Sequence, residues 1–280
     1  MSKVEFEKYS VLMSVYEKEN PEYFNQAVNS MLKQTLFPDQ FVIVKDGPLT
    51  TELESIIDFY VSKYPKLFTI VSLTENVGLG KALDEGLKYC KNELVARMDA
   101  DDISLPNRCE EQVKMFRNQP DLSIVGTMID EFYDDPNNIV SSRIVPTEHE
   151  KIVKFIRRRS PFNHPTVMFK KSDVIKVGGY GKFRRKQDFD LFSRMINSGC
   201  KGANVNKSLL LFRSTENSFK RRKSWINCKS YIDVQLKIWK RKHCNIFDLI
   251  YVIIGQLIIF ISPIWLLKLI TNKFLRSEKK

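Results

Sequence analysis

The 280-residue chain is poor in cysteine, and its few cysteines do not form a recognisable set. There are five, an odd number, and no C-x-x-C pair occurs. A disulfide framework or a structural zinc site would need such pairs, so both are disfavoured. The N-terminal segment MSKVEFEKY is polar and charged and does not read as a signal peptide. These absences predict a protein of a reducing compartment such as the cytoplasm.

The largest part of the chain also lacks a surplus of either charge, although the net charge is +12. Residues 218–243 hold nine basic residues and one acidic residue, and residues 268–280 hold five basic residues and one acidic residue. A broad nucleic-acid-binding face on residues 1–217 is therefore excluded, because such a face needs a basic surface. The charge distribution predicts instead a local anionic partner near the C-terminal segment.

Short apolar runs alternate with segments of helical periodicity, and 43% of residues are hydrophobic, enough for a sizeable core. This alternation predicts an α/β fold with a mostly parallel, doubly wound sheet and helices on both faces. The predicted strands are 10–15, 41–44, 67–73, 94–98, 123–127, 139–145, 166–169 and 209–212. The predicted helices are 21–34, 52–63, 78–89, 106–118, 147–158 and 188–197.

An acidic cluster, Arg97-Met98-Asp99-Ala100-Asp101-Asp102, closes the predicted strand 94–98. Repulsion makes three neighbouring carboxylates costly unless a cation joins them. At a strand end of an α/β sheet they would face the crevice where ligands bind. Carboxylate oxygens suit Mg²⁺ or Mn²⁺, which commonly reach a substrate through phosphate oxygens. The cluster predicts a metal-dependent diphosphate site; the alternative is a solvated acidic turn before a helix that begins near Ser104 and Pro106.

Polar residues also follow the three preceding strands. Tyr16 and Glu17 follow the first, and an aromatic ring there could stack on a nucleobase. Asp46 ends the second and could accept a hydrogen bond from a base. The segment Asn76–Lys81 follows the third and opens a helix, where backbone amides and Lys81 could meet ribose or phosphate. Each alone also fits an ordinary turn or helix cap, but together they predict a nucleotide site at one edge of the sheet.

The joint pattern resembles family 2 glycosyltransferases of the GT-A fold, over about residues 9–215. The motifs that carry the resemblance are Ser14-Val15-Tyr16, Asp46-Gly47, Asn76-x-Gly78, Arg97–Asp102 and Gln187-Asp188-Phe189-Asp190-Leu191. The resemblance implies a Rossmann-like GT-A domain over residues 1–217, with a nucleotide-sugar half (1–104) and an acceptor half (105–217). It also implies inverting transfer of a sugar, usually from a uridine diphosphate (UDP) sugar.

Position by position, the resemblance assigns site residues. The nucleotide-sugar-binding set would be Tyr16, Glu17, Asp46, Asn76, Lys81, Arg97, Asp99 and Ala100. Asp101, with Asp99, would bind Mn²⁺ or Mg²⁺ that bridges the diphosphate, and Asp102 would support that site. Asp188 resembles the catalytic base, which takes the acceptor hydroxyl proton. The family usually has Glu-Asp where this chain has Gln187-Asp188, and Asp190 is a second candidate for the base.

Four further residues are predicted on the acceptor side. His164, in Asn163-His164-Pro165-Thr166, resembles a family segment near the acceptor, although it also fits a loop that enters the next strand. Two basic triplets, 157–159 and 184–186, flank the presumed acceptor mouth. They predict a diphosphate-bearing lipid acceptor that Arg184 and Arg185 contact; the alternative is a solvated charged face. Asp102 and Asp190 complete this weaker acceptor-side group.

The C-terminal segment, residues 218–280, is predicted to associate with a membrane. Residues 218–243 combine basic and aromatic residues, as in amphipathic helices on anionic membrane surfaces; the alternative is an ordinary helix packed on the catalytic domain. Leu249–Leu267 contains no charged residue and has nearly membrane-spanning length. A single span would oppose the positive-inside tendency. A re-entrant or interfacial hairpin broken near Ser262-Pro263 is therefore preferred over a transmembrane helix.

These interpretations together predict an enzyme at the cytoplasmic face of a bacterial inner membrane. It would transfer a hexose, with galactose or glucose favoured, from a UDP-sugar to a polyprenyl-diphosphate-linked glycan of an O-antigen, capsule or other surface polysaccharide. The resemblance extends to β-1,3-hexosyltransferases that act on undecaprenyl-diphosphate-linked N-acetylhexosamine. The alternatives are a sugar nucleotidyltransferase, disfavoured because a Gly-rich N-terminal phosphate loop is missing, and a catalytically inactive membrane scaffold.

Overall fold

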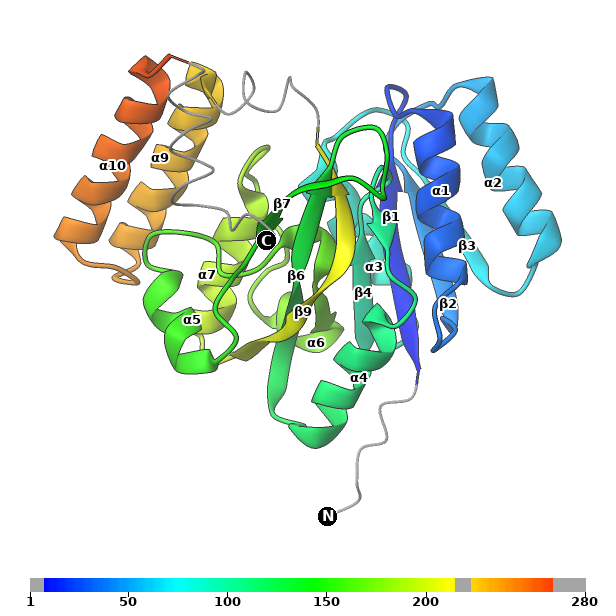
Figure 1. Ribbon diagram of the computed structural model, residues 1–280, viewed down its shortest axis with the longest axis horizontal. Helices are drawn as coiled ribbons and strands as arrows, with labels where there is room; N and C mark the ends of the chain where they lie inside the picture. Colours follow the sequence, from blue (N-terminus) through cyan, green and yellow to red (C-terminus); the bar gives the residue numbers. More distant parts are fainter. Residues whose placement is uncertain (1–7, 215–222, 264–280) are drawn as a thin grey trace.

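The computed structural model describes residues 8–214 and 223–263, whose strands form one mixed sheet in the order β3-β2-β1-β4-β8-β6-β9-β5, with β7 paired to β6 (Figure 1). The strands are β1 (Tyr9–Val15), β2 (Gln40–Lys45), β3 (Phe68–Ser72), β4 (Leu94–Met98), β5 (Ile103–Ser104), β6 (Leu122–Phe132), β7 (Ile139–Arg143), β8 (Met168–Lys170) and β9 (Lys201–Arg213). The helices are α1 (Pro21–Leu32), α2 (Thr51–Lys63), α3 (Leu79–Tyr89), α4 (Arg108–Asn118), α5 (His149–Phe155), α6 (Lys171–Lys176), α7 (Gln187–Asn197), α9 (Trp225–Lys240) and α10 (Ile246–Ile261), with a short 3₁₀ helix, η1 (His164–Thr166).

The N-terminal half is the parallel part of the sheet. Strand β1 pairs in parallel with both β2 and β4, and β2 pairs in parallel with β3. Because both faces of this part are covered by helices, β1, β2 and β4 read as nearly continuous apolar runs rather than as alternating ones. The predicted α/β fold is confirmed, and the carboxyl ends of these strands meet at one edge.

Two hydrophobic cores lie on the two faces of the sheet. One packs α1, α2 and α4 against it through residues such as Phe24, Leu53 and Phe116. The other packs α3, α5, α7 and α9 through residues such as Leu83 and Phe192. Helix α3 approaches so closely that a Cβ at Gly86 would lie 2.4 Å from Val44 Cγ2. This tight approach fixes the loop that precedes α3 at the sheet edge.

The C-terminal half departs from a purely parallel arrangement. Strand β8 runs antiparallel to both β4 and β6, whereas β6 and β9 are parallel. Strand β9 is much longer than the predicted strand 209–212, and α6 was not predicted. The helix predicted from residue 106 begins at Arg108, because Ser104 belongs to β5, which pairs with β9. The Ser104 hydroxyl accepts a hydrogen bond from Gln34 Nε2 at 3.1 Å instead of capping the helix.

Helices α9 and α10 form an antiparallel pair at one side of the molecule (Figure 1). Val234 and Ile238 of α9 are fully buried in the second core, and Gln235 Nε2 donates to the carbonyl of Arg157 at 2.8 Å. The described part of segment 218–243 is therefore helical, but its apolar face packs on the catalytic domain. For that face the ordinary packed helix, rather than a membrane-surface helix, is what the structure shows.

Helix α10 begins with a capping box between Asn245 and Asp248 and ends at Ile261, where the break near Ser262-Pro263 was predicted. Asp248 also receives Arg157 at 2.7 Å and Arg158 at 2.6 Å, which fastens α10 to the domain. Among residues 8–214 and 223–263, none of the helices has the length and apolar character needed to cross a bilayer. The remainder of the Leu249–Leu267 run and the second arm of the predicted hairpin lie outside the described residues.

Candidate active site

The loops after β2 and β3 are locked together at the carboxyl edge of the sheet. The Asp46 carboxylate accepts hydrogen bonds from the backbone N–H of Val77 at 2.7 Å, from that of Gly78 at 3.1 Å, and from Asn76 Nδ2 at 3.1 Å. Gly47 has φ of +90°, and a Cβ there would lie 2.9 Å from the Asn76 nitrogen. Asp46 therefore positions the loop that opens α3, and its predicted contact with a base must use a remaining lone pair.

A cavity of about 330 Å³ opens beside this loop. Asn76, Gly78 and Lys81 line one side, and Lys182, Phe183 and Arg184 line the other. This placement puts Arg184 next to predicted nucleotide-binding residues rather than on the acceptor side. Arg185 is exposed and does not line the cavity.

Tyr16 and Glu17 follow β1, and both are exposed. Their exposure leaves them accessible to a nucleotide, so their predicted roles stay predictions.

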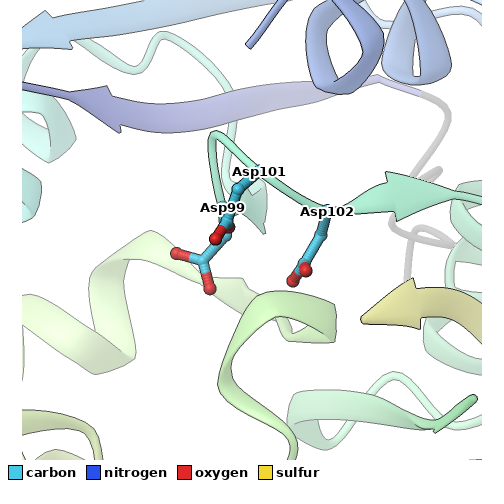
Figure 2. A group of neighbouring side chains, drawn as sticks. All are labelled: Asp99, Asp101 and Asp102. Carbon is cyan, nitrogen blue, oxygen red and sulfur yellow. The ribbon is translucent and has the colours of Figure 1, made fainter. Parts of the chain in front are cut away.

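The acidic cluster occupies the loop between β4 and β5 (Figure 2). Carboxylate oxygens of Asp99, Asp101 and Asp102 lie within 4.8 Å of one another. Burial, followed by the charges of Asp99 and Glu19, raises the pKa of Asp101 to about 7. Burial and the charge of Asp101 raise the pKa of Asp102 well above its usual range. Oxygen ligands at this spacing, each penalised by its neighbours, fit a divalent cation such as Mn²⁺ or Mg²⁺.

The three carboxylates are not equivalent. Asp102 is fully buried, and its Oδ1 accepts from the backbone N–H of Arg213 on β9 at 2.9 Å. Its Oδ2 has no hydrogen-bond partner among the described residues. Ala100, between the other two, is also buried, so Asp99 and Asp101 project from a loop with little freedom. This geometry fits Asp99 and Asp101 as ligands and Asp102 as their support.

Glu19 is a carboxylate that sequence reasoning missed. It lies in the turn after β1, and burial raises its pKa, with the charge of Asp99 acting in the same direction. The only available signal was its position just past Tyr16, because nothing in the local pattern connects it to residues 99–101. Glu19 therefore adds negative charge to the metal-ligand cluster.

Arg97 is 1% exposed and lies at the centre of the site. Its Nη2 pairs with the Asp99 carboxylate, while its Nε and Nη1 have no hydrogen-bond partner among residues 8–214 and 223–263. A buried guanidinium with unused donors suits an anionic group. The predicted contact between Arg97 and the nucleotide sugar fits this geometry.

His164 and Tyr180 form a pair in the same region. His164 Nε2 lies 2.9 Å from the Tyr180 hydroxyl, and the rings meet edge to face at 5.4 Å. Burial lowers the pKa of His164 well below its usual range, and the charge of Arg97 lowers it further, so the imidazole is neutral. Tyr180, which the sequence did not single out, is held by Asp84, whose carboxylate accepts from the Tyr180 backbone N–H at 2.7 Å. The pair therefore presents a fixed, uncharged polar surface.

The two acidic residues at the start of α7 have different surroundings. Asp190 is 3% exposed and accepts from Arg194 at 2.9 Å and from Arg241 of α9 at 2.6 Å. That pairing gives Asp190 a structural role and contradicts its placement on the acceptor side. Asp188 is only partly buried and lies in the electrostatic neighbourhood of Tyr180 and Tyr231. Of the two carboxylates, Asp188 is the one that could reach a substrate hydroxyl.

The first basic triplet is divided between two tasks. Arg157 and Arg158 pair with Asp248 and fasten α10 to the domain, as described above. Arg159 is partly buried and lies in the electrostatic neighbourhood of Arg143 on β7 and of Tyr231 on α9. The triplet therefore does not act as one acceptor-binding group, and Arg143 is a basic residue that sequence reasoning missed.

Comparison with known proteins follows from this geometry. The family model described as Glycosyl transferase family 2 matches residues 10–187, from the first residues of β1 to the start of α7. The chain belongs to glycosyltransferase family 2. This glycosyltransferase is 34% identical over 256 residues to the UDP-Gal:alpha-D-GlcNAc-diphosphoundecaprenol beta-1,3-galactosyltransferase of Escherichia coli, covering 91% of this chain and 92% of the relative. It is 35% identical to the amylovoran biosynthesis glycosyltransferase AmsE of Erwinia amylovora, over 84% of this chain and 85% of that one.

Solved structures show the same fold at low identity. The mannosyltransferase PcManGT from Pyrobaculum calidifontis, in complex with GDP-Man and Mn²⁺, superposes with a TM-score of 0.63 at 15% identity; the match covers 83% of this chain and 64% of that one. Residues 1–349 of TarS from S. aureus, in complex with UDP-GlcNAc, superpose with a TM-score of 0.58 at 14% identity, over 84% of this chain and 72% of that one. The predicted GT-A architecture is confirmed, and the nucleotidyltransferase alternative is set aside.

Proposed function

We propose that this glycosyltransferase transfers a hexose, with inversion, from a UDP-sugar to a sugar of a lipid-diphosphate-linked glycan in bacterial surface polysaccharide synthesis. The observation that carries the proposal is the cluster of Asp99, Asp101 and Asp102 at the carboxyl edge of the sheet, with Asp188 as a partly buried carboxylate at the start of α7. The printed activity of the Escherichia coli relative supports the donor and the acceptor class. Galactose and glucose are the favoured hexoses.

In the proposed reaction, the donor nucleotide lies along the edge formed by Tyr16, Asp46, Asn76 and Lys81. The Arg97 guanidinium donates its unused N–H groups to the diphosphate. Asp99 and Asp101 hold Mn²⁺ or Mg²⁺, which neutralises the charge that develops on the leaving diphosphate. These contacts would stabilise the transition state more than the ground state, because the negative charge grows as the bond to the anomeric carbon breaks.

Asp188 acts from the acceptor side. The acceptor hydroxyl oxygen attacks the anomeric carbon while its proton passes to the Asp188 carboxylate, and the bond from that carbon to the diphosphate oxygen breaks. Attack on the face opposite to the leaving group inverts the configuration. The neutral His164 imidazole, fixed by Tyr180, would orient the donor sugar or the acceptor without competing for the proton.

We further propose peripheral binding to the cytoplasmic face of the bacterial inner membrane, through the outer face of α10. Exposed apolar residues recur along this helix at helical spacing: Phe247, Ile250, Tyr251, Ile254, Ile258 and Ile261. A stripe of this kind suits the interfacial region of a bilayer, where a lipid-linked acceptor would also be found.

The test uses purified protein with Mn²⁺ or with EDTA, a panel of nucleotide sugars, and a synthetic N-acetylglucosamine linked to a short lipid through diphosphate. We expect Mn²⁺-dependent hydrolysis of one UDP-sugar and its transfer to the acceptor. Asp101→Ala should abolish both, and Asp188→Asn should abolish transfer while donor binding persists. Asp121→Asn, which removes a surface carboxylate paired with Lys201, is the matched control.

If the wild-type protein neither hydrolyses nor transfers any donor, the inactive-scaffold alternative stands. If donor is hydrolysed but never transferred to lipid-diphosphate acceptors, the acceptor part of the proposal falls alone.

A further inference from the structure

Arg143, the last residue of β7, is a guanidinium whose partners are incomplete. Its Nε is buried and has no hydrogen-bond partner among residues 8–214 and 223–263. Its backbone is fixed, because its carbonyl accepts from Asn163 Nδ2 at 3.4 Å and its register on β6 is set opposite Ile129. Buried polar atoms without partners are rare in proteins, so an arginine held this way commonly meets a ligand.

The electrostatic surroundings of Arg143 are mixed but carry surplus positive charge. Burial, followed by the charge of Arg159, lowers the pKa of Arg143 to about 10, while Asp188, Tyr231 and Glu131 act in the opposite direction. Two arginines that destabilise each other's charge in a desolvated place create a site for an anion. An anion bound between them would relieve both their repulsion and the unmet hydrogen bond.

Tyr231 of α9 forms a wall of the same site. Its hydroxyl donates to the carbonyl of Arg158 at 3.1 Å, and its ring packs 5.3 Å from that of Phe189 on α7. The ammonium group of Lys186 lies over the Tyr231 ring at 5.5 Å, which brings a further positive charge to the entrance of α7. Elements far apart in sequence, β7, α7 and α9, therefore surround one position next to Asp188.

We propose that Arg143 binds the phosphate attached to the acceptor sugar, with Arg159 beside it and with Tyr231 completing the wall. This inference rests on the proposed function, in which Asp188 deprotonates the acceptor sugar. A hydroxyl of that sugar must reach Asp188, so the phosphate on the anomeric carbon of the same sugar lies one ring away. The planar guanidinium suits a phosphate, because it can donate two parallel hydrogen bonds. The other phosphate source in the reaction is the donor diphosphate, which the proposal places at Arg97 and the acidic cluster.

The experiment compares two acceptors in the presence of Mn²⁺ and the donor that the wild type hydrolyses. One is octyl-diphosphate N-acetylglucosamine, and the other is octyl N-acetylglucosaminide, which lacks phosphate. The variants are Arg143→Gln and Arg143→Lys, with Lys154→Gln on α5 as the control, since Lys154 is exposed and its loss removes one positive charge from the same lobe. Thermal unfolding is recorded for each, and Arg143→Lys carries the test if Arg143→Gln does not fold.

With the diphosphate acceptor, we expect Arg143→Gln to raise acceptor KM by about ten- to a hundredfold, the range for losing a hydrogen bond to a charged group. Arg143→Lys should give a smaller increase, because it keeps the charge but not the two-pronged geometry. The donor KM and the weak rate with the phosphate-free acceptor should match those of the wild type and of Lys154→Gln.

Three outcomes would overturn the inference. An unchanged acceptor KM would remove any role for Arg143, a parallel rise in donor KM would assign it to the donor diphosphate, and equal losses with both acceptors would make its role structural. The proposed function fails in a different way: the wild type itself would then transfer to neither acceptor, and the inference would fall with it.

Discussion

Arg241 on α9 donates from Nη1 to Oδ1 of Asp190 on α7 at 2.6 Å, while the other oxygen of Asp190 accepts from Arg194 at 2.9 Å. Asp190 lies two residues after the proposed base, Asp188, so this contact ties the position of the base to a helix outside the family match. Helix α9 is therefore part of the catalytic structure as well as the residue that walls the acceptor site. The predicted division of the chain at residue 217 stays a prediction about segments, but the two segments share a core.

Replacing Asp190 should destabilise the protein and lower the rate. Asp190→Asn keeps the shape but leaves the guanidinium groups of Arg194 and Arg241 without a counter-charge. We expect the free energy of unfolding, measured by urea titration, to fall by about 2–4 kcal/mol, because breaking a buried ion pair leaves a buried charge uncompensated. The kcat for transfer should fall with it, since α7 carries the base.

Arg241→Gln is the graded control for that experiment. Arg241 is about one-third exposed, and Arg194 still pairs with Asp190 when Arg241 is lost. The loss of stability should therefore be clearly smaller than for Asp190→Asn. Equal losses for the two variants would show that the buried carboxylate is not the centre of the network.

Asp101→Asn should stabilise the metal-free protein while it abolishes activity. Burial and the neighbouring carboxylates raise the pKa of Asp101 to about 7, so its ionised form is unfavourable in the folded state. In EDTA at pH 8, we expect the variant to gain about 1–2 kcal/mol in the free energy of unfolding. The gain should disappear as the pH falls from 7 toward 4, because the wild-type carboxyl is then protonated in the folded state and finally in both states.

Metal binding gives the second half of this prediction. Mn²⁺ should raise the melting temperature of the wild type, because a ligand that binds only the folded state stabilises it. The same addition should leave the melting temperature of Asp101→Asn unchanged. A variant that is less stable than the wild type in EDTA would mean that the three carboxylates do not repel one another as their spacing implies.

The sequence predicted the first half of the sheet well, because buried parallel strands leave a local signal. The runs 10–15, 41–44 and 94–98 are apolar on both faces, and each fell within one residue of the observed strand at both ends. The mixed half left a weaker signal. Strand β9 begins Lys201-Gly202-Ala203-Asn204, whose polar residues are explained only by tertiary contacts, such as that of Asn204 Nδ2 with the carbonyl of Pro146 at 2.6 Å.

The candidate site was predictable where its residues share a motif, and it was not where distant segments meet. The acidic cluster could be found from its spacing alone. Glu19, Arg143 and Tyr180 could not, because their place in the site depends on how the loop after β1, strand β7 and the loop before α7 pack. The C-terminal interpretation failed for a related reason: the apolar face of α9 looks the same in sequence whether it meets a bilayer or α7.

The outer face of α10 provides a test of membrane binding that leaves the catalytic edge untouched. Phe247, Ile254 and Ile261 are between 52% and 75% exposed, so replacing all three with Ser removes apolar surface without opening the core. We expect co-sedimentation with vesicles of anionic phospholipid to fall at least tenfold, in line with losing several exposed anchors. Hydrolysis of the soluble donor should be unchanged.

A matched control for this variant replaces apolar residues on another helix. Phe59 of α2 and Ile175 of α6 are 57% and 56% exposed and lie away from α10. Their double replacement with Ser should leave vesicle binding intact. If it lowers binding as much as the α10 variant does, the interaction is non-specific and the proposed orientation at the membrane falls.

Arg184 and Arg185 are adjacent in sequence, yet the structure separates their roles. Arg184 lines the cavity that Asn76 and Lys81 also line, and a Cβ at Gly78 would lie 3.6 Å from Arg184 Cγ, whereas Arg185 is exposed and outside that cavity. The sequence pattern had assigned both to the acceptor. We now expect Arg184→Gln to raise donor KM by about three- to tenfold, the size of a partly screened charge contact with phosphate. Acceptor KM should stay within a factor of two.

Arg185→Gln serves as the control that has the same charge change one position away, and it should alter neither constant. Measuring both KM values for both variants also separates the two interpretations of the basic triplet. If Arg184→Gln raises acceptor KM and leaves donor KM unchanged, the original assignment to the acceptor is right, and the cavity beside α3 is not part of the donor site. If the two variants behave alike, the triplet acts through its total charge, and the contact of Arg184 with the loop before α3 does not matter for binding.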